Sequence, residues 1–254
     1  MKILGVIPAR FGSTRFPGKP LALINGKPMV QHVYQRCLRA KLLDKVVVAT
    51  DDKRICDCVL GFGGQAVMTS KKHRSGSDRI AELIRKPGYR GFSIILNIQG
   101  DEPLIDPGAI DLLAGEMAGN PKQMMATLAT SFENAGDIEK SNTAKVVTDT
   151  QGRALYFSRL PIPFIREENA GRVGHYLKHI GMYAYRQNFL IKFTQWPEGR
   201  LERMEKLEQL RALENGAAIK VLRTNYRCLA VDSPGDINKI EISIKAANRR
   251  LKRG

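Results

Sequence analysis

The chain has 254 residues, of which 43% are hydrophobic and 26% charged, an ordinary balance for a globular protein with one large domain, and its net charge is +16. It has no apolar run of the roughly 18 residues that a membrane-spanning helix needs, and its opening apolar stretch is too short for a signal peptide, so we expect a cytoplasmic protein. The positive charge suits a nucleic acid, a membrane surface or a polyanionic small substrate, and does not choose among them.

The first half of the chain alternates short apolar strands with helical stretches. Strands are predicted at residues 3–7, 45–50, 65–68 and 93–98, the first ended by Pro8. Helices are predicted at residues 28–42, 53–60 and 77–85, and after residue 107. This alternation predicts a parallel, doubly wound sheet, in which ligands bind beyond the carboxyl ends of the strands.

The pattern changes in the second half of the chain. Strands are predicted at residues 125–130, 144–148 and 154–157, and residues 160–200 are expected to form an insertion that covers a site or pairs subunits. We treat residues 1–254 as a single domain that carries this insertion. One long helix is predicted over residues 201–215, with a core-facing stripe formed by Leu201, Met204, Leu207, Leu210 and Leu213.

Two further features are expected to carry no chemistry. The basic cluster at residues 249–253 is predicted to be a solvated, frayed terminus, with weak attraction to a membrane surface or RNA as the alternative. The four cysteines lack metal-ligand spacing and are expected to be free thiols.

A loop rich in Gly, Ser, Arg and Pro follows the first strand. From Arg10 to Lys19 it combines three cations with glycines and with the hydroxyls of Ser13 and Thr14. Such a loop can wrap a triphosphate through backbone N–H groups and charge-assisted hydrogen bonds. Its spacing matches neither the Walker nor the Rossmann phosphate loop, and a mobile basic loop is the alternative.

Acidic residues follow two of the apolar stretches. Asp101 comes directly after the strand at residues 93–98, beside Gly100, where a carboxylate is placed to hold Mg²⁺. The alternative for Asp101 is a turn or helix-capping residue. Asp232 and Asp236 offer a second acid, and Asp236 is the weaker candidate because its context is also typical of a helix start.

A third polar cluster, at residues 73–79, opens a predicted helix. Its small and polar residues suit contact with a base or a phosphate. His73 on its own is more typical of a surface turn than of a ligand-binding site.

Seven motifs occur in chain order: Pro8-Ala9-Arg10-x-x-Ser13-Thr14-Arg15-x-Pro17-Gly18-Lys19-Pro20, Ala49-Thr50-Asp51-Asp52, His73-x-Ser75-Gly76-Ser77-Asp78-Arg79, Asn97-x-Gln99-Gly100-Asp101-Glu102-Pro103, Tyr156-Phe157-Ser158-Arg159, Lys178-His179-x-Gly181-x-Tyr183 and Leu207-Glu208-Gln209-Leu210-Arg211. Together they resemble the bacterial 3-deoxy-manno-octulosonate (Kdo) cytidylyltransferases over nearly the whole chain.

This resemblance implies an α/β fold: a Rossmann-like, GT-A-like nucleotidyltransferase with a mostly parallel sheet, flanking helices and a dimerisation arm. It implies Mg²⁺-dependent transfer of CMP from CTP to the anomeric hydroxyl of Kdo, with release of pyrophosphate, as a step of lipopolysaccharide synthesis. It also implies a homodimer, with no specific nucleic acid as partner and no membrane insertion.

The resemblance assigns roles residue by residue. Arg10, Lys19 and Asp101 would be catalytic, and Asp101 and Asp232 would hold Mg²⁺. The nucleotide would be bound by Pro8, Ala9, Arg10, Ser13, Arg15, Lys19, His73, Ser75, Gly76 and Arg79. The sugar acid would face Gln99, Arg159, His179, Tyr183, Glu208 and Gln209, with Arg159 opposite its carboxylate.

Three alternatives stay open at the level of sequence. Within enzymes, the chain could be a cytidylyltransferase for 8-amino-Kdo or another acidic sugar. A basic nucleic-acid-binding module would account for the charge, but it predicts a localised patch or an aromatic platform, and aromatic residues are only 7% of this chain. A nonenzymatic sugar-nucleotide sensor would need altered acids or cations, yet Arg10, Lys19, Asp101 and Asp232 are all present.

Overall fold

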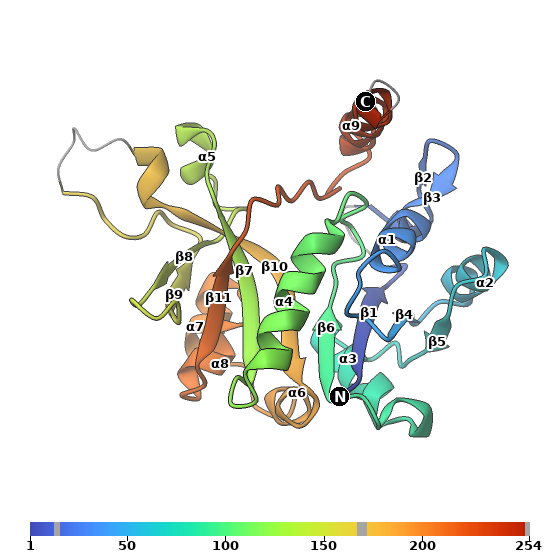
Figure 1. Ribbon diagram of the computed structural model, residues 1–254, viewed down its shortest axis with the longest axis horizontal. Helices are drawn as coiled ribbons and strands as arrows, with labels where there is room; N and C mark the ends of the chain where they lie inside the picture. Colours follow the sequence, from blue (N-terminus) through green and yellow to red (C-terminus); the bar gives the residue numbers. More distant parts are fainter. Residues whose placement is uncertain (13–15, 167–171, 252–254) are drawn as a thin grey trace. The chain divides into compact units, whose positions relative to one another are not determined.

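The computed structural model describes residues 1–12, 16–166 and 172–251 (Figure 1). The chain divides into two compact units: unit 1 is Met1–Asp111 with Cys228–Gly254, and unit 2 is Leu112–Arg227. Within the described ranges, no helix is both long and apolar enough to cross a membrane.

A parallel sheet forms the centre of unit 1, with the strand order β6-β1-β4-β5. These strands are β1 (Ile3–Ala9), β4 (Lys45–Thr50), β5 (Ala66–Met68) and β6 (Ile94–Asn97). Most apolar residues of β1, β4 and β6 are buried, as expected where helices cover a parallel sheet, whereas those of the edge strand β5 are partly buried or exposed. Because parallel strands end at one edge, the polar segments that follow β1, β4 and β6 come together there.

The prediction that Pro8 ends the first strand is wrong, because β1 continues to Ala9 and Pro8 lies opposite Ala49 of β4. Pairing of β1 with β6 stops earlier, at Val6 and Asn97. Beyond Val6, β1 therefore has a ladder partner on one side only, and proline is tolerated at such an edge position.

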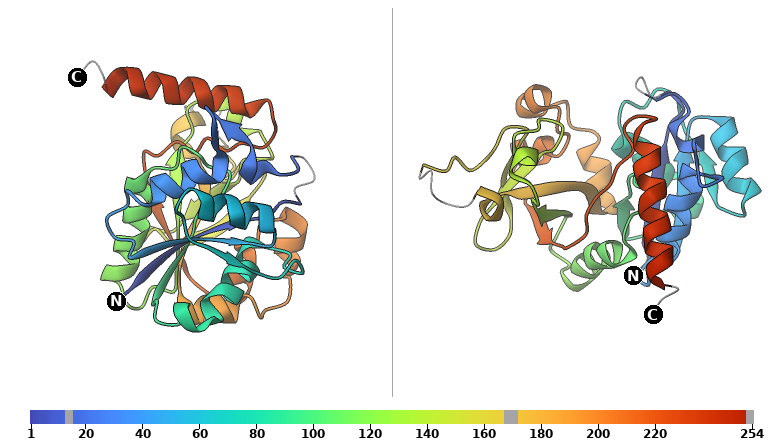
Figure 2. Two further views of the ribbon diagram at one scale, coloured as in Figure 1. Left: turned by 90° about the vertical axis from the view of Figure 1, so that its right-hand side faces the viewer. Right: turned by 90° about the horizontal axis from the view of Figure 1, so that it is seen from above.

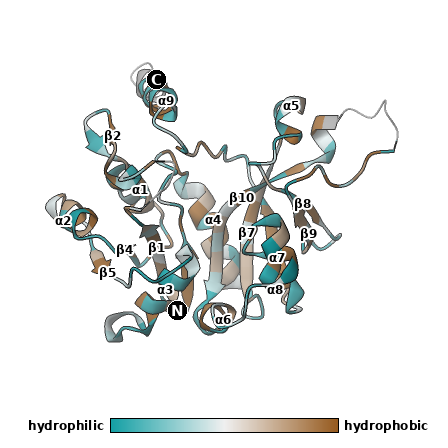
Figure 3. Cartoon of the chain, turned by 180° about the vertical axis from the view of Figure 1, so that it is seen from behind, coloured by the Kyte–Doolittle hydropathy of each residue, from teal (hydrophilic) through white to brown (hydrophobic). Residues whose placement is uncertain are grey.

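The strands of unit 1 are connected by α1 (Met29–Cys37), α2 (Lys53–Gly61) and α3 (Gly76–Arg85). Figure 3 shows both hydrophilic and hydrophobic residues on α2, as an amphipathic helix requires. The helix predicted at 28–42 is shorter than expected, since α1 ends at Cys37 and Leu38 is 59% exposed.

The short hairpin of β2 (Leu23–Ile24) and β3 (Lys27–Pro28) contacts the C-terminal helix α9 (Asp236–Leu251), as Figure 2 also shows. A small apolar core holds them together, formed by Ile24, Met29, Val231 and Ile240. The frayed terminus predicted for the basic cluster is therefore wrong up to Leu251, which is helical, and residues 252–254 lie outside the described residues.

Unit 2 has a mixed sheet with the strand order β11-β7-β10, continued by β8 and β9. Its strands are β7 (Met125–Ser131), β8 (Lys145–Thr148), β9 (Ala154–Ser158), β10 (Leu177–Arg186) and β11 (Ile219–Arg223). Strand β10 runs antiparallel to β7, and a bulge shifts their register between Ile180 and Tyr183. The sequence patterns predicted β7, β8 and β9 but missed β10 and β11.

The single helix predicted over residues 201–215 is wrong. The structure has α7 (Arg200–Glu205) and α8 (Leu210–Glu214), separated at Lys206, whose φ of 53° is left-handed and ends the first helix. The core stripe is also broken, because Met204 is 70% exposed whereas Leu210 is fully buried.

The remaining helical elements are α4 (Pro107–Gly119), α5 (Ala135–Ile138), α6 (Gln187–Phe193), and the 3-10 turns η1 (Lys19–Leu21), η2 (Pro87–Tyr89) and η3 (Arg172–His175). Of these, η1 matters most for the site, because it carries Lys19.

Candidate active site

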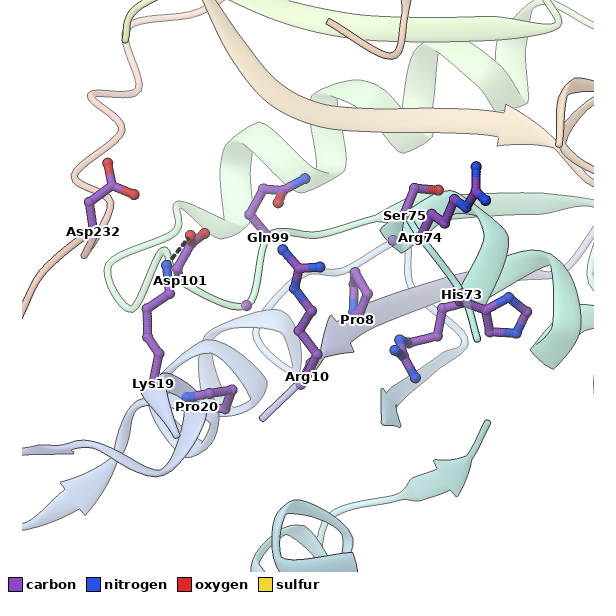
Figure 4. A pocket seen from close by; sticks show the side chains of 14 residues that line it. Pro8, Arg10, Lys19, Pro20, His73, Arg74, Ser75, Gln99, Asp101 and Asp232 are labelled. Carbon is purple, nitrogen blue, oxygen red and sulfur yellow. Dashed lines mark hydrogen bonds and ion pairs between the residues drawn. The ribbon is translucent and has the colours of Figure 1, made fainter. Parts of the chain in front are cut away.

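A pocket of about 300 Å³ lies in unit 1 beyond the carboxyl ends of β1 and β6 (Figure 4). It is lined by Pro8, Ala9, Arg10, Lys19, Pro20, His73, Arg74, Ser75, Gly76, Arg79, Gln99, Gly100, Asp101 and Asp232. Figure 4 shows Lys19 and the two acids at one end of the pocket, and the turn before α3 at the other. The predicted nucleotide and metal residues that the structure describes all line this one cavity.

Lys19 is held at the acidic end of the pocket. Its ammonium donates to Asp101 Oδ2 at 2.7 Å and to the main-chain oxygen of Val231 at 2.9 Å. The lysine comes from η1 and the aspartate from the turn after β6, so the ion pair joins the two predicted motifs. The Lys19 ammonium, held here by the Asp101 carboxylate, can also neutralise the charge of a phosphate bound at this end of the pocket.

The two later acids have different surroundings. Asp232 lines the pocket, whereas Asp236 begins α9 and accepts hydrogen bonds from the backbone N–H groups of Asp232 and Ser233 and from the Ser233 hydroxyl. The bonds from Ser233 lower the pKa of Asp236 to about 2. Asp236 is thus a helix-start residue, as its sequence context indicated, which leaves Asp232 as the second pocket acid.

Two glycines allow the chain to pack closely around Pro8. A side chain at Gly76 would meet the Pro8 ring at 3.2 Å, and one at Gly100 would meet the Pro8 carbonyl oxygen at 3.1 Å. Both distances are shorter than ordinary contacts. Glycine at these positions therefore lets the turn before α3 and the turn after β6 approach the end of β1 and form the pocket wall.

The base of the basic loop is fixed by a stack on Phe11. The Arg54 guanidinium lies 3.4 Å from the centre of the Phe11 ring and is itself paired with Asp52. Gly18, with a φ of 70°, donates its N–H to the Phe11 carbonyl oxygen at 2.9 Å and packs under the same ring. Ser13 and Arg15, predicted to bind phosphate, lie outside the described residues.

Two predicted nucleotide residues are engaged by the protein itself. Arg79 is 3% exposed and donates to Asp51 Oδ2 at 2.7 Å and to the Thr69 hydroxyl at 2.5 Å. The His73 ring is 2.6 Å from Glu82. Both residues line the pocket, but the Arg79 guanidinium and the His73 imidazole are bonded to residues outside the pocket lining.

Ser75 caps helix α3. Its hydroxyl accepts from the N–H of Asp78, and the Asp78 carboxylate accepts from the N–H of Ser75, which makes a capping box. The capping box fixes the turn that carries Gly76, so the sequence pattern typical of a helix start also shapes the pocket.

Arg159, predicted to face the sugar carboxylate, lies in unit 2 at the end of β9. Its guanidinium donates to the main-chain oxygens of Ser141 at 2.8 Å, Glu205 at 2.5 Å and Lys206 at 3.1 Å. An arginine has five N–H donors, so two are left without a partner among the described residues. The Glu205 carboxylate also accepts hydrogen bonds from the main-chain N–H of Arg159 and from the Ser158 hydroxyl. Together these bonds fix the position of the arginine.

His179 and Tyr183 lie on β10 with their rings 5.5 Å apart. The Phe157 ring meets His179 edge-on at 4.9 Å, and the Thr127 hydroxyl lies 3.0 Å from His179 Nε2. Burial lowers the pKa of His179 to about 3, so the imidazole is neutral at physiological pH. Burial also raises the pKa of Tyr183.

The remaining predicted sugar residues lie in both units. Gln209 precedes α8 and is 3% exposed, and within the described chain its Nε2 has no hydrogen-bond partner. Glu208 is its neighbour and is partly buried. Gln99 lines the pocket of unit 1. These sugar-binding roles stay predictions.

Several residues at these sites were not singled out from the sequence. The pocket lining includes Pro20, Arg74 and Gly100, and each stands inside a predicted motif, which was the available signal. Asn97 also ends β6 with its Oδ1 buried and, among the described groups, without a hydrogen bond. No local pattern marked Thr127, because its neighbours are distant in sequence.

Comparison with known proteins identifies the class. The family model described as "Cytidylyltransferase" matches residues 4–221. The fold closely resembles a solved structure of CMP:2-keto-3-deoxy-manno-octonic acid synthetase complexed with CTP, with a TM-score of 0.91 and 42% identity over 97% of this chain and 100% of that one. The parallel sheet, the pocket at its carboxyl edge and these matches define a cytidylyltransferase with a Rossmann-like nucleotidyltransferase fold.

The particular family follows from curated relatives. The chain is 50% identical to the 3-deoxy-manno-octulosonate cytidylyltransferase of Geobacter sulfurreducens, over 96% of this chain and 100% of the relative. It is 48% identical to the protein of the same name in Trichlorobacter lovleyi, over 100% of both chains. The chain belongs to the family of 3-deoxy-manno-octulosonate cytidylyltransferases.

Proposed function

We propose that the chain transfers CMP from CTP to the anomeric hydroxyl of Kdo, giving CMP-Kdo and pyrophosphate. The observation that carries the proposal is that Arg10, Lys19, Asp101 and Asp232 line one cavity at the carboxyl edge of the parallel sheet, in a chain of this family. The names of the relatives favour Kdo over its 8-amino analogue as acceptor. A solved relative is described in complex with CTP, which supports CTP as donor.

In the proposed reaction the anomeric oxygen forms a bond to the α-phosphorus and the bond to the oxygen that bridges to the β-phosphate breaks. The hydroxyl gives up its proton to solvent, and pyrophosphate leaves with the electrons of the broken bond. Arg10 and Lys19 would neutralise the phosphates and the leaving group, because both cations line the cavity. The close packing of Gly76 and Gly100 on Pro8 would form a wall for the base.

Mg²⁺ fits the donor set at the acidic end of the pocket. Asp101 and Asp232 offer hard carboxylate oxygens, and in the described ranges no group of three or more His, Cys, Asp or Glu side chains would hold an ion unaided. Two carboxylates with phosphate oxygens and water are a usual Mg²⁺ environment, and the bound ion would offset charge on the α-phosphate. Lys19, paired with Asp101, would then turn to the phosphates.

For the sugar acid we propose the unit 2 residues already described. The two spare N–H groups of Arg159 would bind the carboxylate, while the three main-chain bonds of its guanidinium keep its plane fixed. His179, Tyr183, Glu208 and Gln209 would bind the hydroxyl groups.

We also propose a cytoplasmic homodimer whose product serves lipopolysaccharide synthesis. Support for the dimer comes from the segment after β9, where Leu160 is 70% and Phe164 is 88% exposed. Apolar side chains so exposed are typical of surfaces covered by another chain. Sedimentation of the protein and of a Leu160→Ser, Phe164→Ser variant tests the dimer, which the variant should weaken.

The reaction is tested by measuring pyrophosphate release from CTP with Mg²⁺ in four parallel arms: Kdo, 8-amino-Kdo, N-acetylneuraminate and no sugar. Release with Kdo alone is expected. Preference for 8-amino-Kdo would mean that the proposed reaction is right but that its acceptor is the amino sugar. No release from folded protein that still binds CTP would overturn the enzyme in favour of a sugar-nucleotide sensor.

A further inference from the structure

The bulge in β10 places one hydroxyl beside two carbonyl oxygens and one imidazole nitrogen. Thr127 of β7 is fully buried, and its Oγ1 lies 2.9 Å from the Met182 carbonyl oxygen, 3.1 Å from the Ile180 carbonyl oxygen and 3.0 Å from His179 Nε2. In regular antiparallel pairing one residue of β10 would face Thr127. The register shift between Ile180 and Tyr183 instead brings two carbonyls to it, those of Ile180 and Met182 on either side of Gly181.

Counting hydrogens fixes the direction of these bonds. A threonine hydroxyl has one hydrogen, and a carbonyl oxygen can only accept. If that hydrogen went to His179, the Thr127 oxygen would face two carbonyl oxygens at about 3 Å with no hydrogen between them, which is repulsive. The arrangement is satisfied when Thr127 shares its single hydrogen between the two carbonyl oxygens of β10 and accepts from a protonated His179 Nε2.

The neutral state of the ring completes the assignment. A neutral imidazole carries one hydrogen, so protonation at Nε2 leaves a lone pair on Nδ1. Burial beside Phe157 and Tyr183 lowers the pKa of His179 to about 3 and so disfavours a second proton. Among the described residues, none forms a hydrogen bond with Nδ1.

We propose that Thr127 is a positioning residue that sets the tautomer of His179, so that Nδ1 accepts a hydrogen bond from a sugar hydroxyl. The sugar as ligand rests on the proposed function, whereas the tautomer does not. His179 then selects a hydroxyl donor on the acceptor sugar, and it acts neither as a cation for the carboxylate nor as a proton donor. Thr127 acts through this ring and needs no contact with the substrate.

The tautomer can be observed without any substrate. Nitrogen-15 NMR of the histidine-labelled protein should give His179 an Nε2 with the chemical shift of a protonated nitrogen and an Nδ1 with that of an unprotonated one at neutral pH. A His179→Asn spectrum assigns the signals among the four histidines. The reverse pattern, or a doubly protonated ring, would overturn the proposal whatever the substrate is.

The role in binding is tested with Thr127→Val, which keeps the shape and removes the hydroxyl, and with Thr127→Ser, which keeps the hydroxyl. In the valine variant the His179 tautomers should mix, and the KM for Kdo should rise about tenfold while the KM for CTP is unchanged. Serine should restore both the tautomer and the KM. A valine variant with the wild-type tautomer or the wild-type KM for Kdo contradicts the assignment.

A titration with Kdo separates this proposal from the proposed function. Addition of Kdo with a CTP analogue that cannot react should shift the His179 Nδ1 signal of the wild-type protein. If Kdo leaves every histidine signal unchanged and no pyrophosphate is released, the proposed function fails while the tautomer measurement stands. If pyrophosphate is released with Kdo but Nδ1 does not shift, the hydroxyl contact at His179 is wrong.

Discussion

Two aspartates that follow apolar segments show how a residue takes its role from its neighbours. Asp101 is paired with Lys19 and lines the pocket, whereas Asp236 accepts hydrogen bonds from Ser233 and starts a helix. Both are partly buried carboxylates in similar local sequence, after an apolar stretch and near glycine. What separates them is the origin of their partners: Asp101 pairs with Lys19, 82 residues away in sequence, whereas Asp236 is held by its near neighbours Ser233 and Lys239.

Replacing Asp101 with Asn should reduce turnover about a hundredfold or more, because the charge at the acidic end of the pocket is lost. The free energy of unfolding should fall by no more than about 1 kcal/mol, since the ion pair with Lys19 is partly exposed. Steady-state kinetics and urea unfolding measure the two effects. Asp137→Asn, at an exposed ion pair in unit 2, is the control and should retain turnover; near-normal turnover of Asp101→Asn would refute the metal assignment.

Stability should fall as the pH is lowered below about 6.5, in part because of His179. The pKa of His179 is about 3 in the folded chain, below the pKa of 6.5 of an ordinary histidine. Between these two pH values the unfolded state binds a proton that the folded state does not. The contribution of neutral His179 to the free energy of unfolding is therefore complete above about pH 6.5 and is lost as the pH falls towards 3. The loss is roughly 1 kcal/mol near pH 5.5.

Urea unfolding near neutral pH and at mildly acidic pH measures this loss. His179→Asn should lose less stability on acidification than the wild type, while a matched His175→Asn variant, at an exposed histidine, should behave as the wild type. Equal losses in the His179 and His175 variants would show that His179 does not titrate as described.

Single elements of this fold are held by contacts that sequence patterns do not reveal. Helix α9 has an ordinary amphipathic pattern, yet its apolar face packs on residues from the other end of the chain, Ile24 and Met29. Its polar face is also tied there, because Glu241 accepts from the N–H of Asn25 at 2.7 Å. The C-terminal helix is therefore part of the core of unit 1.

Ile240→Ala should lower the free energy of unfolding by about 2–4 kcal/mol, because Ile240 is 2% exposed and its loss leaves a cavity in that core. Ile242→Ala, two residues away on the same helix and 63% exposed, is the matched control and should cost less than about 1 kcal/mol. Thermal or urea unfolding compares them, and equal effects would mean that α9 does not pack as described.

Strand β8 depends on a buried lysine. Lys145 is fully buried, and its ammonium donates to the main-chain oxygens of Lys140, Thr143 and Arg159 at 2.7–2.9 Å. Burial lowers the pKa of Lys145, while the three carbonyl oxygens satisfy its donors. The lysine thus ties the turn before β8 to the residue proposed to bind the sugar carboxylate.

Lys145→Met should destabilise the protein by about 2–3 kcal/mol, since three carbonyl oxygens lose their donor. The KM for Kdo should rise more than the KM for CTP, because Arg159 loses one of its supports. Lys140→Met, at an exposed lysine of the same turn, should change neither quantity appreciably. Wild-type stability of the Lys145 variant would refute this role.

At the scale of the whole molecule, the charge of +16 fits a polyanionic substrate. The pocket itself is lined by cations, among them Arg10, Lys19 and Arg74, which attract the phosphates of CTP. The KM for CTP should therefore rise with ionic strength at fixed Mg²⁺, while the KM for Kdo, with its single charge, should rise less. Kinetics at increasing sodium chloride measure this, and a KM for CTP independent of salt would mean that the net charge has another purpose.

The sequence by itself determined the parallel strands of unit 1 and the helices between them, the family, and most of the residues that line the pocket. Parallel strands of apolar residues, such as Lys45–Thr50, carry a strong local signal, and the motifs follow directly in the chain. Features without a local sequence pattern were decided by the tertiary structure alone. Strand β10 owes its place to pairing with β7, a strand distant in sequence, and Lys206 divides the predicted helix through a left-handed turn. The bonds that occupy Arg79, Arg159 and His179 likewise come from segments distant in sequence, and only folding brings those partners together.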